Sequence, residues 1–72
     1  MDAKEQEFVS PREIDMIRYR DSRTAIAFHL INGDVIEGSI RWFDRDAVRL
    51  VLADRSELTL FFHAVAYYQA RT

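Results

Sequence analysis

The sequence predicts an α+β fold, with one N-terminal helix followed by a small, strongly bent antiparallel barrel of five strands. Three observations support this prediction. A helix-start pattern stands at Ser10-Pro11-Arg12-Glu13, and five short alternating apolar segments follow it. Asn32-Gly33 separates the first two segments and is the strongest short-range signal for a hairpin. Gly38 lies inside the second segment, where a glycine indicates a bend or the close approach of another backbone.

The size and composition of the chain limit what can stabilise it. Its 72 residues form one domain, and so short a chain buries a modest core that usually needs further support. There is no cysteine, which excludes disulfides and thiolate metal sites and fits a reducing compartment. His29 and His63 are too far apart in the sequence to resemble a zinc pair. We therefore expect no metal and no cofactor, and association between copies remains as the support.

We expect no targeting signal in the N-terminal segment. Residues 1–9 are mostly charged or polar and are predicted to form a flexible tail before a domain that spans residues 10–70. The tail lacks the basic and apolar regions of a secretory signal, and no run approaches the length of a membrane span. We expect a cytoplasmic protein without membrane insertion.

The charged residues are balanced in number but not in kind. The formal net charge is −2, and Lys4 is the only lysine among ten basic residues. Balanced charge disfavours non-specific duplex binding, which needs a broad basic face. Arginine suits planar, directional contacts to phosphate, base or carboxylate. Composition alone does not identify the partner.

The helix is predicted from its start signals. Ser10 can cap the helix and complete a capping box with Glu13, while proline suits the first helical position. Asp21-Ser22 is the expected end. The apolar stripe is expected at Ile14, Met16 and Ile17. We expect this one-sided helix to lie across an open end of the barrel.

The period-two segments define the strands and the residues that share a face. The sets expected to share a face are Ile26, Phe28 and Leu30; Ile36, Gly38, Ile40 and Trp42; Val48, Leu50 and Leu52; Leu58, Leu60 and Phe62; and Val65 and Tyr67, opposite Ala66 and Tyr68.

Two of these runs are apolar on both faces, and a small barrel cannot bury both. The fourth and fifth strands also carry open edges, which are a hazard unless they are covered. Edge pairing between copies would cover both, and a head-to-tail contact of this kind can close into a ring. Phe61 and Tyr67 are the expected residues of the subunit interface.

Two motifs add a family resemblance. They are Ile31-Asn32-Gly33 with Gly38, Ile40 and Phe43-Asp44, and the later Phe61-Phe62-His63-Ala64-Val65. With the helix before them, they resemble the Sm-like family, and within it bacterial Hfq, over residues 10–69. The spacing is most similar to the divergent Hfq of cyanobacteria. The resemblance implies a homohexameric ring, closed by pairing of the fourth strand with the fifth strand of the next copy. It also implies RNA binding and post-transcriptional regulation.

The resemblance locates a pore face that takes uridine-rich RNA. Its family positions are matched here by Arg45, Asp46, Phe62 and His63. Asp46 replaces a stacking aromatic residue, and Phe62 replaces a lysine. Stacking of a base on an aromatic ring contributes about 1–3 kcal/mol, so RNA binding at this face is expected to be weakened. His63 has a second interpretation, as a strand-end histidine that holds the subunit contact.

Two further RNA surfaces follow from the same resemblance. On the distal face, His29 matches a stacking tyrosine, and two nearby carboxylates oppose an anionic ligand. On the rim, Arg20 and Arg23 match an arginine cluster, with Asp21 between them. The alternative for these arginines is a solvated, salt-bridged helix end.

Three functional hypotheses remain open. The first is an RNA-binding ring of altered preference that uses Arg45, His63 and the rim arginines. The second is a protein-docking ring whose Arg12, Asp46 and Phe62 hold a peptide, since aromatic residues with arginine are typical of protein interfaces. Cyanobacterial relatives imply the type IV pilus motor ATPase as that partner, and hence a role in motility. An enzyme is not expected, because the sequence has no nucleophile–base pair and no phosphate loop.

Overall fold

The computed structural model describes residues 10–71 of the chain, so the tail predicted at residues 1–9 lies outside the described residues. Its elements are α2 (Pro11–Ser22), β1 (Ala25–Leu30), β2 (Val35–Phe43), β3 (Ala47–Val51), β4 (Glu57–Phe61), the short 3₁₀ turn η1 (Phe62–Ala64) and β5 (Val65–Arg71). The strands form one antiparallel sheet in the order β4-β3-β2-β1-β5. The predicted fold class is confirmed. Within residues 10–71, no helix is long and apolar enough to cross a membrane.

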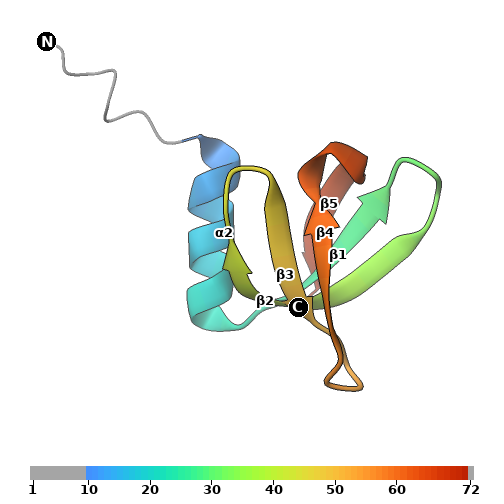
Figure 1. Cartoon of the computed structure of the whole chain (residues 1–72). Helices are drawn as coiled ribbons and strands as arrows, with labels where there is room; N and C mark the ends of the chain where they lie inside the picture. The colour runs from blue at the N-terminus through green and yellow to red at the C-terminus, as the bar shows by residue number, and fades with distance from the viewer. Residues whose placement is uncertain (1–9, 72) are drawn as a thin grey trace, which may run out of the picture.

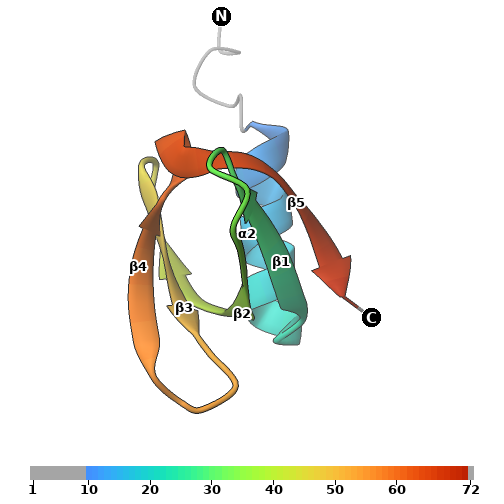
Figure 2. The ribbon, with the colours of Figure 1, turned by 90° about the vertical axis from the view of Figure 1, so that its right-hand side faces the viewer.

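The sheet curls into a barrel that is open between its two end strands. Figure 2 shows the strands arranged around a central space, with β4 and β5 at the two free ends of the curl. The turn η1 lies beside the β1–β2 hairpin, where the Ile31 N–H donates to the carbonyl of Ala64 at 2.9 Å. Helix α2 packs alongside β2, on the outside of the curl (Figure 1).

The helix begins and ends as the sequence predicts. The Ser10 side chain accepts a hydrogen bond from the Glu13 N–H, and the Glu13 carboxylate accepts one from the Ser10 N–H. This is a complete capping box, which satisfies backbone donors that have no partner inside the helix. At the other end, Arg23 adopts a left-handed conformation (φ 57°) and its N–H bonds back to the last turn. The helix therefore stops after Ser22.

The apolar stripe of the helix differs from the prediction. Met16 is fully buried, but Ile14 and Ile17 are 44% and 41% exposed. Tyr19 packs against the core, three residues after Met16. Positions three residues apart share a helix face, so Met16 and Tyr19 face the barrel while the two isoleucines face away. The prediction was wrong because it grouped residues that lie on different sides of the helix.

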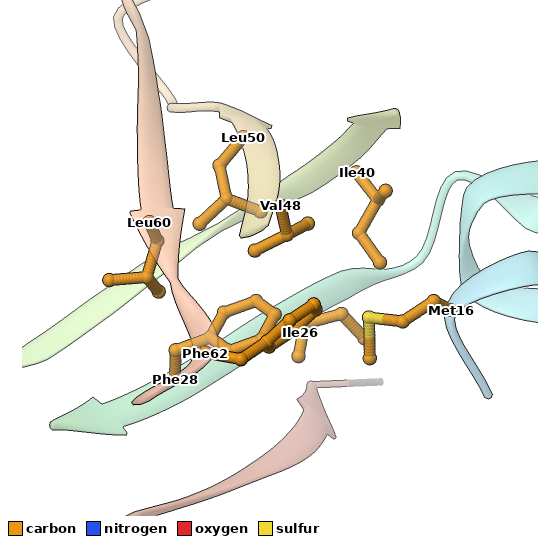
Figure 3. Packing of buried hydrophobic residues seen from close by; sticks show 8 residues of the cluster. All are labelled: Met16, Ile26, Phe28, Ile40, Val48, Leu50, Leu60 and Phe62. Atoms are coloured by element: carbon orange, nitrogen blue, oxygen red, sulfur yellow. The ribbon is translucent and has the colours of Figure 1, made fainter. Parts of the chain in front are cut away.

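The core contains side chains from the helix, all of the first four strands and η1. Its eight buried members are Met16, Ile26, Phe28, Ile40, Val48, Leu50, Leu60 and Phe62. Figure 3 shows Met16 reaching from the helix to one end of this cluster, near Ile26 and Ile40. Met16 is thus the fully buried contribution of the helix to the core, and Tyr19 packs beside it.

A bulge in β2 reverses the expected faces at the end of that strand. The β2–β3 register shifts between Ile40 and Trp42, so one residue, Arg41, is left without a partner. An extra residue on one strand moves the following side chains to the other face. Trp42, predicted to share the face of Ile40, is 43% exposed, and Phe43 packs against the core in its place.

A second bulge acts in the same way on β5. The β1–β5 register shifts between His29 and Leu30, which pair with Tyr67 and Val65. Val65 and Tyr68 both pack against the core, whereas Tyr67 is 55% exposed. Strict alternation had placed Val65 and Tyr67 on one face, and that prediction was wrong.

Gly38 lies where two backbones approach closely. A β-carbon on Gly38 would stand 2.7 Å from the Val51 carbonyl oxygen and 3.1 Å from Leu52 Cδ2. The first distance is shorter than any ordinary contact between such atoms. Glycine at this position is therefore needed for β2 to pass the end of β3, as the sequence indicates.

A long-range hydrogen bond ties the helix to the last strand. The Tyr68 hydroxyl donates to Asp15 Oδ2 at 2.9 Å. Burial, together with this hydrogen bond to a carboxylate, raises the pKa of Tyr68 to about 12. The neutral, donating form of Tyr68 is thus the form that the folded protein favours.

We expect Gly38→Ala to lower the free energy of unfolding by about 1–3 kcal/mol, because the added methyl must displace the backbone at Val51. Gly38→Val should be more severe and prevent folding. Urea unfolding followed by circular dichroism measures the effect, with Ser39→Ala as the matched control on the next residue. An alanine variant as stable as the parent would show that the strands separate at little cost.

We expect Tyr68→Phe to lower the free energy of unfolding by about 1 kcal/mol at neutral pH, through loss of the bond to Asp15. Because the folded pKa of Tyr68 is raised from 10.0 to about 12, its contribution is complete below pH 10 and is lost as the pH rises through 12. The stability difference between parent and variant should therefore shrink over that interval. Tyr67→Phe, at an exposed ring, is the control. A difference that stays constant with pH would contradict the assignment.

Candidate functional site

Five of the predicted site residues meet at one end of the barrel. We call this site the polar hollow; it has a volume of about 330 Å³ and is lined by Arg12, Arg45, Asp46, Phe62 and His63. The first turn of α2, the β2–β3 turn and η1 each contribute to it. These elements are far apart in the sequence, so the hollow exists only in the folded protein.

The β2–β3 turn is held by Asp44. One carboxylate oxygen of Asp44 accepts hydrogen bonds from the N–H groups of Asp46 and Ala47, both at 2.8 Å. Aspartate is favoured in turns because its side chain can bond to the backbone two or three residues later. This arrangement uses the Asp44 carboxylate for structure and leaves Arg45 and Asp46 exposed at the tip.

The turn is joined directly to η1. The Phe62 N–H donates to the carbonyl of Asp46 at 2.8 Å. The Phe62 side chain points into the core and is only 7% exposed. The expectation that Phe62 presents an exposed aromatic surface is therefore wrong. The apolar ring at this position is needed by the core of a short chain.

Arg12 covers the remaining surface of Phe62. Its guanidinium carbon lies 4.1 Å from the centre of the Phe62 ring, and its Nη2 donates to the carbonyl of Arg45 at 3.0 Å. A cation over an aromatic face contributes about 0.5–1 kcal/mol at an exposed site. These two contacts fix a planar guanidinium at the wall of the polar hollow.

The polar hollow can bind anions by directional hydrogen bonds. It presents the guanidinium groups of Arg12 and Arg45, which suit carboxylate or phosphate, beside the carboxylate of Asp46 and the exposed imidazole of His63. The His63 ring stacks with the ring of Phe61, with the ring centres 5.8 Å apart, and Phe61 is 52% exposed. Among residues 10–71, no group of three or more histidine or acidic side chains could hold a metal ion.

The rim arginines form a separate site with a residue that the sequence analysis missed. Arg20, Arg23 and Arg41 line a second hollow of about 400 Å³, together with Ser39, Ile40 and Val51. Arg20 Nε lies 3.3 Å from Asp21 Oδ1, and the guanidinium carbon of Arg20 lies 5.6 Å from the centre of the Phe43 ring. Arg41 belongs here because the β2 bulge turns it toward the helix end, and no sequence signal marks that bulge.

His29 lies apart from both hollows. It stacks on Tyr67 with the ring centres 4.2 Å apart and the planes 9° from parallel. One face of the His29 ring is therefore already occupied within the protomer.

The comparison with family models decides the relationship. A model described as Hfq related matches residues 10–70, which covers every described element except the last residue of β5. The chain belongs to the Hfq-related family. The two motifs and the capped helix lie inside the matched region, so the resemblance seen in the sequence is confirmed.

Solved structures of Hfq have the same fold. One is the 1.55 Å crystal structure of the pleiotropic translational regulator Hfq, which matches with a TM-score of 0.78 and 18% identity, covering 83% of this chain and 98% of that chain. Another is an Hfq protein from Anabaena sp., with a TM-score of 0.74 and 28% identity. This match covers 85% of this chain and 97% of that chain. In all, 48 chains of solved structures match. A search of curated proteins finds no match.

We expect Arg12→Ala to lower the free energy of unfolding by about 1 kcal/mol, because the contacts to Phe62 and to the Arg45 carbonyl are both lost. Arg12→Lys should lose nearly as much, since an ammonium group cannot lie flat on the ring while donating sideways. Urea unfolding measures both variants. Arg18→Ala, at an exposed position of the same helix, should change stability by less than about 0.5 kcal/mol. Equal effects at the two positions would show that the Arg12 contacts contribute nothing.

Proposed function

We propose that the protein is an Hfq-like ring-forming regulator with weakened RNA surfaces, acting at least partly through a protein partner. The proposal rests on one observation: among residues 10–71, the polar hollow has no exposed aromatic ring on its floor, because Phe62 is buried beneath Arg12. A base entering the hollow would meet a guanidinium already held by two contacts and a carboxylate at the turn.

The family supplies the general part of this function. Hfq-related proteins are RNA-binding regulators and not enzymes, and one matched structure is that of a pleiotropic translational regulator. The open edges of β4 and β5 support assembly into a ring, since such edges must be covered, and the family resemblance implies six copies. We therefore assign the protein to post-transcriptional regulation in the cytoplasm.

Weak RNA binding at the polar hollow follows from its residues. The position where the family has a stacking aromatic is Asp46, which is exposed at the tip of the turn. Loss of stacking removes about 1–3 kcal/mol per base. In a ring, one carboxylate from every copy would face the pore and repel phosphate, which offsets the attraction of Arg45.

A protein partner suits the same residues better. Arginine is enriched at protein interfaces, where it combines apolar stacking with directional hydrogen bonds. Arg12 and Arg45 can donate to the carboxylates of a peptide, and Asp46 can accept from its cations. From the resemblance to cyanobacterial Hfq, we propose that this partner is the type IV pilus motor ATPase and that the complex serves motility.

A second candidate function is a conventional RNA chaperone for uridine-rich or adenine-rich RNAs. One observation favours it: Arg20, Arg23 and Arg41 converge on one hollow at the rim. Asp21 and Glu57 each contact one of these arginines, at 3.3 and 3.7 Å, which reduces the charge available to an anionic ligand.

Binding to uridine-rich RNA separates the two functions. We expect the unmodified protein to bind a labelled uridine hexamer weakly at physiological salt, with a shallow dependence on salt because few phosphates are neutralised. Asp46→Phe should strengthen binding by about tenfold or more, the value of one base stack. Asp46→Asn is the matched control, which removes the charge without adding a ring. Fluorescence anisotropy at several salt concentrations measures all three. Tight binding by the unmodified protein would favour the RNA chaperone.

The partner is tested by co-purification with a type IV pilus motor ATPase. We expect Arg45→Ala to weaken the complex about tenfold or more, because Arg45 is exposed at the polar hollow and a guanidinium at the centre of an interface often contributes over 1 kcal/mol. Arg55→Ala, at the exposed β3–β4 hairpin, is the control and should bind like the parent. Equal binding by both variants would place the contact outside the polar hollow.

A further inference from the structure

Trp42 is an exposed aromatic residue that the sites described above do not use. It is the only tryptophan of the chain, and it is 43% exposed. Within residues 10–71, it lines neither the polar hollow nor the hollow of the rim arginines. Its neighbours Ile40 and Phe43 pack in the core, so the strand is held in place while the Trp42 ring stays outside. A large ring left outside a small core is typical of a contact surface.

The strand register places Trp42 in a row that crosses three strands. Trp42 of β2 stands opposite Arg49 of β3, and Arg49 stands opposite Thr59 of β4. Directly opposed residues have their side chains on the same face of a sheet. Val48 and Leu50, on either side of Arg49, are fully buried, so the row lies on the outer face of the barrel. We call Trp42, Arg49 and Thr59 the outer row.

Two arginines near the Trp42 ring share one carboxylate. Arg49 Nε donates to Glu57 Oε1 at 3.1 Å, and Arg49 Nη1 donates to the Thr59 hydroxyl at 2.9 Å. These bonds direct the Arg49 guanidinium toward β4, away from Trp42 on β2. Arg41, one residue before Trp42, places its Nε 3.7 Å from the same oxygen of Glu57. Two positive charges therefore face one negative charge, which leaves a net positive charge beside the ring.

The Trp42 ring is not paired with another ring or with a cation. Arg12 lies over the ring of Phe62, and Arg20 lies over that of Phe43. Among residues 10–71, the structure places no guanidinium and no second aromatic ring on Trp42. An accessible aromatic ring beside arginines combines the two elements of single-stranded nucleic-acid sites, which are base stacking and contacts to the phosphate backbone.

The shape of this surface favours a base over the anchor residue of a protein partner. Anchor residues of protein interfaces are typically enclosed in well-packed pockets. Trp42 instead stands on the convex outer side of the curled sheet (Figure 2). Stacking needs only one accessible face of an aromatic ring, and the outer row offers such a face without a pocket.

We propose that Trp42 stacks a base of single-stranded RNA on the outer wall of the barrel, while Arg41 and Arg49 contact the phosphates beside that base. The proposal rests on the RNA-binding part of the proposed function and states where RNA contact remains when Asp46 occupies the stacking position of the polar hollow. Trp42 stands two strands in from the open β4 edge, a distance of about 10 Å at the usual strand spacing. A ring that covers this edge therefore need not cover Trp42.

The single tryptophan makes this site directly observable, because all tryptophan emission of the full-length protein comes from Trp42. The emission is followed during titration with an unlabelled uridine hexamer at low salt, where weak complexes with RNA form. Fluorescence anisotropy of a labelled hexamer measures binding in parallel. We expect RNA to quench the Trp42 emission with the same midpoint as the anisotropy. This measurement uses the unmodified protein and does not depend on the folding of a variant.

Three variants separate stacking from charge. Trp42→Leu should weaken RNA binding about tenfold, the value of one base stack, and Trp42→Phe should retain most of the affinity of the parent. Arg49→Gln should lower the slope of log affinity against log salt by about 0.7, the contribution of one phosphate of a single strand. Ile17→Ala, at an exposed apolar position of the helix, is the control and should bind like the parent. Urea unfolding verifies that each variant is folded.

Each contrary outcome is distinct. RNA binding without a change in Trp42 emission would overturn the proposal, and so would a Trp42→Leu variant that binds like the parent or a hexamer that does not bind at low salt. If binding is weak in these cases, the weakened RNA surfaces of the proposed function stand. Tight binding that Trp42→Leu leaves unchanged would refute both. Quenching by the type IV pilus motor ATPase but not by RNA would make the outer row a protein contact and overturn the proposal.

Discussion

The Val51 carbonyl oxygen lies 2.7 Å from the point where a β-carbon would stand on Gly38. The curl of the sheet depends on this missing side chain, because β2 pairs with β1 through its first half and with β3 through its second half. A flatter β2 would separate Ile26 and Phe28 from Val48 and Leu50, and the core would have no enclosed volume. The helix could not compensate, since it contributes only Met16 to the fully buried set.

Local signals predicted the elements of this fold better than the orientation of their side chains. The Ser10 capping box, the Asn32-Gly33 hairpin and the glycine in β2 are all determined by residues close together in the sequence. The side of the sheet on which the Trp42 and Tyr67 side chains lie is not determined by nearby residues. Each follows a bulge, where one extra residue is inserted into the strand pairing. Such an insertion is set by the geometry of closing the barrel, and neither Arg41 nor Ala66 is of a type that marks a bulge.

The candidate site was predictable in membership but not in form. The family pattern brought Arg45, Asp46 and His63 together, and the structure places all three beside Arg12. The family pattern could not reveal that Phe62 is buried, because an apolar residue in place of a lysine is consistent with either a surface or a core position. The alternation that groups Phe62 with Leu58 and Leu60 did indicate it, since Leu60 and Phe62 are both buried. Arg41 was missed for a related reason, since its place beside Arg20 exists only after the bulge has turned it.

The first turn and a half of α2 is held at two points, by residues three positions apart. Arg12 contacts the polar hollow through the Arg45 carbonyl, and Asp15 accepts the hydroxyl of Tyr68 on the edge strand β5. Because one short, rigid segment makes both contacts, a shift of the helix caused at either point alters the other. A ligand that shifts the helix when it enters the polar hollow would therefore also alter the Asp15–Tyr68 bond at the β5 edge, and that coupling would be reciprocal.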